Sequence, residues 1–488
     1  MNTDPSMRRG TLLCIAAMFF LSGCASMAPR YEAPALPVAP VYAPETSQDG
    51  ASASAIGWHD YFIDPHLQNL IQRALDNNRD LRTAVLRVEE ARAVHGIQRS
   101  ELFPTVGLQA GADRSRTPAD LNMTGKTLFA SQFQAGLGMA SWELDFWGRV
   151  RSLQDAALEN FLATDAARRA AALGLVAEVA DSYFRLREFD ERIALAQQTI
   201  ASRAESFRIF TRRVEVGSNS RFSLTQVQTL LTQAQALGAQ LEQERDAQFH
   251  ALTLLVGTTV ELPPEHEQSG ERNTLVQIRP GLPSDLLFQR PDIVAAEHRL
   301  KSANANIGAA RAAFFPRIAL TSSLGTASAE LDGLFATGSL AWIFSPSISL
   351  PIFDGGLRSA NLSLAEIRHD MNVASYERTV QAAFRDVADA LSARHWLARQ
   401  VSIARTALTT QAERARLSQL RYDHGASAFL EVLDAQRDLL DAEQRFVQMR
   451  GALLRSNVIL YAALGGGGMD FISAPARTSN RTQGASTP

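Results

Sequence analysis

The side chains that could do chemistry are few, and they do not form a catalytic constellation. Nine histidines are scattered along 488 residues, and no His-Glu-x-x-His motif occurs. Glu297 and His298 have no second histidine at helical spacing, so the pair is interpreted as structural rather than as a metal site. Glycines 465–468 lack the Lys-Ser/Thr that completes a phosphate-binding loop. The sequence therefore predicts a protein that is not an enzyme and that holds no cofactor or metal.

Composition narrows the class further. The chain has 51 acidic and 48 basic residues, and a net charge of −3 argues against a nucleic-acid partner. Two cysteines exclude a disulfide scaffold and a cysteine-based zinc module. Aromatic residues make up only 7%, which is low for a β-sandwich or a propeller, whereas alanine, leucine, glutamine and arginine are abundant. This composition favours long helices.

The second cysteine, Cys24, follows a segment that has the features of an export signal. Two arginines precede an apolar run over residues 11–21, and small residues follow up to Cys24. This order is typical of a secretory signal peptide, so residues 1–23 are expected to be cleaved. The ending Leu-Ser-Gly-Cys resembles the bacterial lipobox, which implies that Cys24 carries an N-acyl and S-diacylglycerol lipid. Ala25 in place of aspartate implies the outer membrane as destination; an ordinary signal peptide with a chance cysteine is the alternative.

In the rest of the sequence, the same motifs occur twice in the same order. The Phe-Pro at 103–104 is echoed by the Phe-Pro at 315–316, 212 positions later, and Gly217 is echoed by Gly425 after 208. A period near 208 residues is too long for a solenoid and indicates two similar halves within one body. The predicted segments are a Pro/Ala/Ser-rich extended tether over 24–57, a first half over 58–257, a linker over 258–283, a second half over 284–465 and a disordered tail over 466–488.

Each half contains two stretches in which apolar and polar residues alternate. Such a period of two predicts strands between unlike environments, and a length of about ten residues suits the strands of a membrane β-barrel. A half-buried sheet of a soluble domain is an equal alternative on this pattern alone. Four strands cannot close a barrel, which needs about eight, so a membrane-spanning sheet would require several copies of the chain. The stretches are about 105–113, 131–144, 317–325 and 341–353.

Long helices follow the strands in each half. Residues 149–215 contain no proline and one glycine, and residues 357–423 contain neither. Leu357, Leu364 and Met371 repeat every seven residues, which indicates side-by-side packing of coiled-coil type. A helix of about 67 residues spans roughly 100 Å, more than a compact domain needs. The predicted helices are 66–101, 149–215 and 221–256 in the first half and 291–313, 357–423 and 428–464 in the second.

Several motifs carry a family resemblance. They are Trp-His-Asp-Tyr-Phe-Ile-Asp-Pro from residue 58, Gly-Leu-Pro-Ser-Asp-Leu-Leu from 281 with Arg-Pro-Asp-Ile from 290, and Val-Leu-Asp-Ala-Gln-Arg from 432. Over residues 58–465 the chain resembles the TolC family of outer membrane efflux proteins, in the NodT lipoprotein branch that serves resistance-nodulation-division pumps. The resemblance implies a mainly α fold with a membrane β-barrel. In it, a homotrimer shares one twelve-stranded barrel, four strands per chain, and a periplasmic α-barrel of long helices.

The same resemblance places the functional residues at the helix-to-helix tips. Glycine at 217 and 425 permits the positive φ of a tight reversal. Tyr422 corresponds to a tyrosine that latches the closed tip, and Glu431 and Asp434 to acidic rings that would attract cations. Surface charge on a solvated helix is the alternative for both acids. The predicted adaptor-contacting residues are Gly217, Ser220, Leu224, Gly425, Ala428 and Val432.

Two positions depart from the family pattern. Ser427 stands where a latch arginine is expected, with Arg421 nearby, and Ser223 stands where the first half is expected to carry aspartate. The tip is therefore expected to be held by different bonds, or more loosely.

By resemblance, the expected function is a passive exit duct of a tripartite efflux system, conducting small molecules such as drugs and contributing to multidrug resistance. Its partners would be a periplasmic adaptor (membrane fusion) protein, an inner-membrane pump and outer membrane lipid. It would be lipid-anchored in the outer membrane and extend into the periplasm. The alternatives are the exit duct of a type I protein secretion system and a non-porous, lipid-anchored coiled-coil spacer.

Overall fold

The computed structural model describes residues 26–35, 51–262, 275–279 and 286–467. The predicted signal peptide, Cys24 and the tail from residue 468 lie outside the described residues, as does most of the linker between the halves. Contacts group the chain into two compact units that do not coincide with the two halves, because each unit draws segments from both. The first unit comprises Met1–Ala35, Arg87–Thr164 and Ala295–Glu377, and the second Leu36–Leu86, Asp165–Val294 and Arg378–Pro488.

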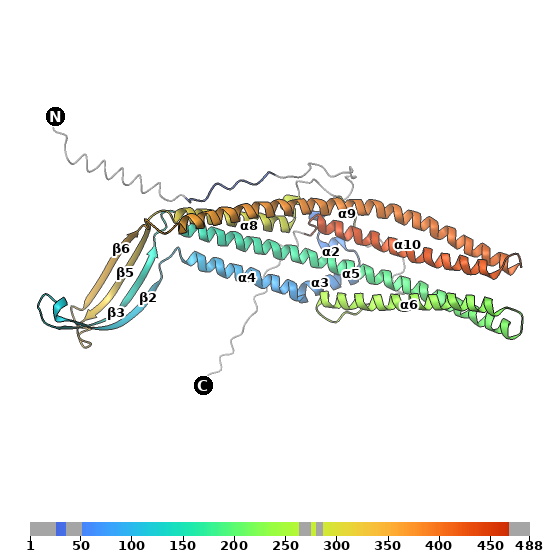
Figure 1. The fold of residues 1–488 in the computed structure, drawn as a ribbon, viewed down its shortest axis with the longest axis horizontal. Helices are drawn as coiled ribbons and strands as arrows, with labels where there is room; N and C mark the ends of the chain where they lie inside the picture. Colours follow the sequence, from blue (N-terminus) through green and yellow to red (C-terminus); the bar gives the residue numbers. More distant parts are fainter. Residues whose placement is uncertain (1–25, 36–50, 263–274, 280–285, 468–488) are drawn as a thin grey trace, which may run out of the picture. The chain divides into compact units, whose positions relative to one another are not determined.

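The first unit contains an antiparallel sheet in the order β2-β3-β5-β6 (Figure 1). All four alternating stretches form strands, although their bounds differ from the predicted ones. The ladder between β2 and β3 continues to the pair of Thr117 with Leu128, whereas the last strand stops at Ser349 and not at the predicted residue 353. The strands are β2 (Val106–Thr117), β3 (Leu128–Glu143), β5 (Arg317–Ser328) and β6 (Leu340–Ser349).

The two faces of this sheet differ in chemistry. One register row crosses all four strands as Leu108, Leu137, Leu324 and Trp342, which are 82%, 54%, 57% and 70% exposed. The next row, on the opposite face, reads Gln109, Gly136, Gly325 and Ala341. One face is therefore apolar and uncovered, and the other is polar and built from small residues.

Helices make up most of the rest. The long predicted helices coincide with α5 (Arg149–Glu215) and α9 (Leu357–Asp423), of 67 residues each, since nothing in these stretches breaks a helix. Each is followed by a returning helix, α6 (Arg221–Val256) or α10 (Phe429–Ala463) (Figure 1). The second half begins with α7 (Leu286–Gln289) and α8 (Pro291–Ala312).

Among the described residues, no helix combines the length and the apolar character that crossing a membrane requires.

The predicted helix over 66–101 is two helices, α3 (Pro65–Asn77) and α4 (Arg79–Ser100). Asn78 separates them with extended backbone angles, and its N–H donates to Ala74 O at 2.8 Å. Its side-chain oxygen accepts from Leu81 N at 2.9 Å, and its amide donates to Leu255 O at 2.9 Å. Asn78 thus ends one helix, caps the next and bonds to the end of α6.

Residues predicted as tether and linker also form structure in the second unit. Strand β1 (Ala51–Ser52) pairs in parallel with β4 (Ile278–Arg279), and Phe62 bridges Leu275. After the short helix α2 (Trp58–Tyr61), Tyr61 stacks on Tyr461 with ring centroids 4.1 Å apart. Two single 3-10 turns complete the described elements, η1 (Ala53–Ala55) and η2 (Ala119–Leu121).

The close approach of β3 and β5 yields a first prediction. A Cβ at Gly136 would lie 2.6 Å from Gly325 Cα and 2.6 Å from Leu324 O, which are backbone atoms that cannot turn aside. We expect Gly136→Ala to destabilise the sheet by about 1–3 kcal/mol through overpacking. The midpoint of thermal unfolding of the detergent-extracted protein measures this. Gly107→Ala is the matched control, because nothing lies within 4 Å of a Cβ there. Equal midpoints for the two variants would contradict the prediction.

Candidate functional site

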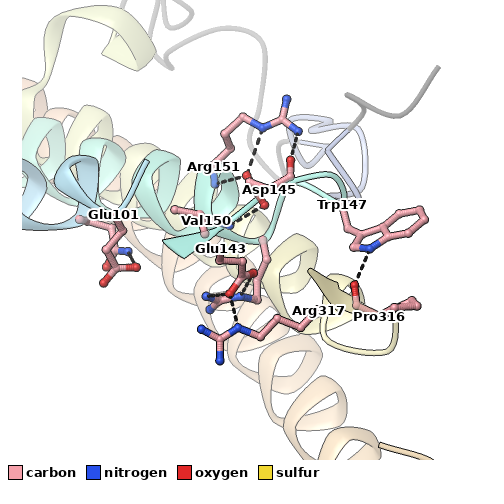
Figure 2. A network of polar contacts seen from close by, with 10 residues as sticks. Glu101, Glu143, Asp145, Trp147, Val150, Arg151, Pro316 and Arg317 are labelled. Atoms are coloured by element: carbon pink, nitrogen blue, oxygen red, sulfur yellow. Dashed lines mark hydrogen bonds and ion pairs between the residues drawn. The ribbon is translucent and has the colours of Figure 1, made fainter. Parts of the chain in front are cut away.

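At the junction of sheet and helix in the first unit, carboxylates organise the start of α5 (Figure 2). Asp145 accepts hydrogen bonds from Val150 N at 3.1 Å and from Arg151 N at 2.9 Å, so it satisfies N–H groups that the first helical turn leaves open. Its negative charge also lies favourably at the positive end of the helix dipole. The Arg151 guanidinium returns to the same carboxylate at 3.2 Å.

Glu143, at the end of β3, binds two arginines. It accepts two hydrogen bonds of 2.9 Å from Arg149 on α5. It also pairs with Arg317 on β5 at 2.9 Å (Figure 2). The hydrogen bonds from Arg149 to Glu143 raise the pKa of that guanidinium. Beside this cluster, Trp147 Nε1 donates to Pro316 O at 2.9 Å, and its ring stacks on Phe315 at 4.7 Å. The segment that leads into α5 therefore contacts the second Phe-Pro, at residues 315–316.

The turn between α5 and α6 reverses through Gly217, whose φ is 74°. Gly217 N donates to Val214 O at 3.1 Å, and Ser218 N donates to Arg213 O at 2.8 Å. Ser220 then caps α6, accepting from Ser223 N at 3.2 Å and lying 3.0 Å from the Ser223 hydroxyl. Ser223, one of the two departures from the family pattern, thus takes part in a capping pair.

The turn between α9 and α10 repeats this geometry. Gly425 has a φ of 69° and donates to Tyr422 O at 2.9 Å, and Ala426 N donates to Arg421 O at 2.8 Å. Nothing lies within 4 Å of a Cβ at Gly425, so the backbone angle rather than space requires glycine. Ala428 occupies the N-cap position and offers no side-chain cap.

The two hairpins meet through an aromatic cluster in the second unit. Phe429 lies 4.5 Å from Phe210 and 4.9 Å from Tyr422, measured between ring centroids. The Arg213 guanidinium lies 5.5 Å from the Phe210 ring and donates to the Tyr422 hydroxyl at 2.8 Å. The buried residues beneath are Phe210, Val227 and Leu433. Tyr422, the predicted latch residue, is therefore bonded to the other hairpin by Arg213.

Both predicted acidic residues pair with an arginine of the same chain. Glu431 lies 2.5 Å from Arg421, and Asp434 lies 3.4 Å from Arg437. The sequence indicated Arg421 near the tip, but neither its partner Glu431 nor the role of Arg213 was predicted. The sequence did contain a signal, because Arg213 and Arg421 each stand four positions before a tip glycine, at equivalent points of the predicted repeat.

The predicted adaptor-contacting residues divide by exposure. Gly217, Ser220, Gly425 and Ala428 are exposed, and Leu224 is half-buried. Val432 is 0% exposed, so in this structure it packs inside the hairpin and forms no part of its surface.

No group of three or more histidine, cysteine, aspartate or glutamate side chains is placed to hold a metal within the described part of the chain. Glu297 and His298 have separate partners: Lys301 at 2.8 Å for the glutamate and Glu159 at 2.6 Å for the histidine.

An amphipathic four-stranded sheet joined to long helical hairpins defines a class of outer membrane channel proteins. The model of the outer membrane efflux protein family matches residues 70–258 and 282–466, and the chain belongs to this family. It is 44% identical to the outer membrane protein OprJ of Pseudomonas aeruginosa over 91% of this chain and 93% of OprJ. It is 41% identical to the toluene efflux pump outer membrane protein TtgC of Pseudomonas putida, over 94% and 96%.

Solved structures show the same fold. The open state of the MtrE outer membrane channel of Neisseria gonorrhoeae superposes with a TM-score of 0.83 at 40% identity, covering 91% of this chain and 98% of MtrE. A membrane protein from Pseudomonas aeruginosa gives a TM-score of 0.86 at 43% identity, covering 91% and 98%.

The Glu143 cluster yields a second prediction. Glu143→Gln would leave Arg149 and Arg317 without the charge that holds them, so we expect a loss of about 1–3 kcal/mol in stability. The measurement is the midpoint of thermal unfolding at constant salt. Glu413→Gln is the control, because Glu413 and Arg416 form an exposed pair within α9. If Glu143→Gln had the same unfolding midpoint as the wild-type protein, the Glu143 cluster would not contribute to stability.

Proposed function

We propose that this chain forms, as a homotrimer, the outer membrane exit duct of a tripartite efflux system that passively conducts small molecules. The observation that carries the proposal is the sheet, which combines an exposed apolar face with a polar face of small residues. A lipid bilayer suits the first face and a water-filled lumen suits the second. The efflux-pump names of the relatives favour this function over a protein secretion duct, and the amphipathic sheet argues against a non-porous spacer.

Closure of the sheet supports a trimer. In the described part of the chain, β2 and β6 each pair with a single neighbour, so each leaves one edge of backbone groups open. Three copies would supply twelve strands, enough to close a barrel and remove every edge. Strands β2 and β6 run in opposite directions, so the β6 edge of one copy can continue antiparallel with the β2 edge of the next.

Exposed apolar side chains extend these edges into the helices of the first unit. After β6, α9 carries the exposed residues Leu357, Leu364, Ile367 and Met371. Before β2, Val94, Ile97 and Phe103 are exposed on and after α4. We infer that these two stripes cover each other between neighbouring copies. The seven-residue repeat predicted from the sequence would then pack between chains rather than within one.

The trimer can be tested at this stripe. We expect Ile367→Asp to reduce the trimer fraction at least about tenfold, because burying an unpaired carboxylate costs several kcal/mol. Native mass spectrometry of detergent-extracted protein measures the fraction. Asn361→Asp, which adds the same charge at an exposed position of α9 beside the stripe, is the matched control. An unchanged trimer in Ile367→Asp would place the interface elsewhere.

The hairpin tips would form the periplasmic gate and the docking surface for the adaptor protein, which connects the duct to a resistance-nodulation-division pump. We infer that the bond of Arg213 to Tyr422 holds the two hairpins together in the closed gate. The pairs of Arg421 with Glu431 and of Arg437 with Asp434 would moderate the negative collar expected from three copies of these acids. The exposed tip residues, among them Ser220 and Ala428, would contact the adaptor.

Conductance tests the gate. The hydrogen bond from Arg213 to Tyr422 contributes about 0.5–1.5 kcal/mol in each subunit, so Arg213→Ala should raise the open-to-closed ratio in planar bilayers by about two- to twelvefold per subunit. Arg212→Ala is the control, because Arg212 pairs with Glu215 on the surface of the same helix. Equal conductance of the two variants would remove Arg213 from the gate.

The remaining parts of the proposal concern anchoring and origin. Cys24 would carry the lipid that anchors the protein to the outer membrane, and the hairpins would extend into the periplasm. An internal duplication would account for the matching element order, in which α5 and α9 have 67 residues each and α6 and α10 have 36 and 35.

A further inference from the structure

Charged residues are few in the sheet of the first unit, and they are divided between its two faces by sign. The four strands contain five charged residues. By their register, Asp113, Glu143 and Arg317 lie on the polar face. The other two, Arg114 and Arg116, lie on the apolar face, because they follow its residues at even spacing along β2 and the ladder to β3 has no bulge there. The apolar face therefore carries two cations and no acid on the four described strands.

Both arginines lie toward the end of β2 that is farthest from the helices. Helix α4 leads into the opposite end of the strand, at Val106 (Figure 1). Arg114 and Arg116 pair with Ser131 and Phe129 of β3, close to the turn of the hairpin. In the proposed duct the helices extend into the periplasm, so this end of the sheet faces the outside of the cell.

Their distance from the helix end places the arginines at the border of the apolar band. From Val106 to Arg114 the strand extends about 27 Å, which is about 20 Å of height at a tilt of about 40°. The apolar band of an outer membrane barrel is about 25 Å tall, and a long arginine side chain reaches the rest of that height. An arginine on the lipid face is costly at the middle of the bilayer and costs little at its border. The pair therefore marks the level of the lipid headgroups.

The surroundings of the two arginines suit a phosphate group. Both residues are exposed, and neither forms an ion pair within the part of the chain that the structure describes. The Arg116 guanidinium lies 6.0 Å from the centre of the Phe129 ring, and Ser131 stands opposite Arg114 with a hydroxyl on the same face. Two guanidinium groups and a hydroxyl can donate to the oxygens of a phosphate, which arginine binds with two parallel hydrogen bonds. The aromatic ring is typical of the girdle of a barrel at the membrane border.

We propose that Arg114 and Arg116 bind the phosphate groups of the phosphorylated glycolipid that forms the outer leaflet of the outer membrane. The proposal rests on the proposed duct, because only a sheet that spans the membrane brings this face to the outer leaflet. Phospholipid headgroups of the inner leaflet would lie at the opposite end of the strands, near Val106. Three copies would place three arginine pairs around the barrel, and these pairs would hold it at a fixed depth in the membrane.

Native mass spectrometry of the full-length protein in detergent tests this site. Diphosphorylated lipid A is titrated against the protein, and the fraction of protein that carries it gives the affinity. Dephosphorylated lipid A, which has the same acyl chains, is titrated in parallel, and inorganic phosphate is added as a competitor. Each spectrum also gives the number of chains in the complex.

The test variant carries Arg114→Gln and Arg116→Gln together. We expect it to bind diphosphorylated lipid A at least about tenfold more weakly than the wild-type protein, because charge-assisted hydrogen bonds to phosphate are lost. Its affinity for dephosphorylated lipid A should not change. The matched control carries Arg208→Gln and Arg212→Gln, which remove two exposed arginines of α5 and change the net charge equally. All four positions are exposed, so these variants should fold as the wild-type protein does.

The outcomes separate the lipid site from the duct on which it rests. Weaker binding of diphosphorylated lipid A in the test variant alone supports the site. Equal affinity in the test variant and the wild-type protein, both as trimers, overturns the site and leaves the duct standing. An equal loss in the control variant assigns the effect to net charge, and displacement of the lipid by an equal concentration of inorganic phosphate assigns the site to the free anion; either result overturns the proposal. A monomer or dimer in the wild-type spectrum overturns the duct, and the membrane setting of the site with it.

Discussion

A strand at the end of a sheet leaves half of its backbone N–H and C=O groups without a partner, and lipid offers none. In the first unit this constraint applies at both edges, because β2 and β6 each have one neighbour among the described strands. The apolar row through Leu108 and Trp342 suits contact with lipid, where unpaired backbone groups are most costly. One chain cannot close this sheet, so the edges need partners from other copies. The proposed trimer, the stripe on α9 and the duct all follow from satisfying these edges.

The same sheet needs a rigid attachment to the helices. At the junction, Glu143 gathers one arginine from α5 and one from β5, while Asp145 fixes the first turn of α5. An isolated ion pair on the surface contributes little to stability. At this junction, however, each carboxylate binds two partners and is largely shielded from solvent. The cost of leaving such groups unpaired makes the junction resistant to deformation.

Local patterns in the sequence predicted the elements better than the contacts between them. The bounds of α5 and α9 follow from the absence of helix breakers, and the strands follow from period-two alternation. The break at Asn78 was missed because it depends partly on a bond to Leu255, 177 positions away. The hydrogen bond from Asn304 to Pro29 was missed for the same reason, since the two residues meet only in the fold. The spacing of the two halves could have identified Arg213 as the counterpart of Arg421. It could not have predicted the hydrogen bond from Arg213 to Tyr422.

Closure by three copies is the central claim, and one preparation tests it. Full-length protein extracted from outer membranes would be weighed by native mass spectrometry and then placed in planar bilayers. We expect a trimer with a small, mostly closed conductance, because the edges pair between copies and the tips stay bonded. A monomer or dimer without pore activity would contradict the barrel, and would leave the sheet as part of a lipid-anchored spacer.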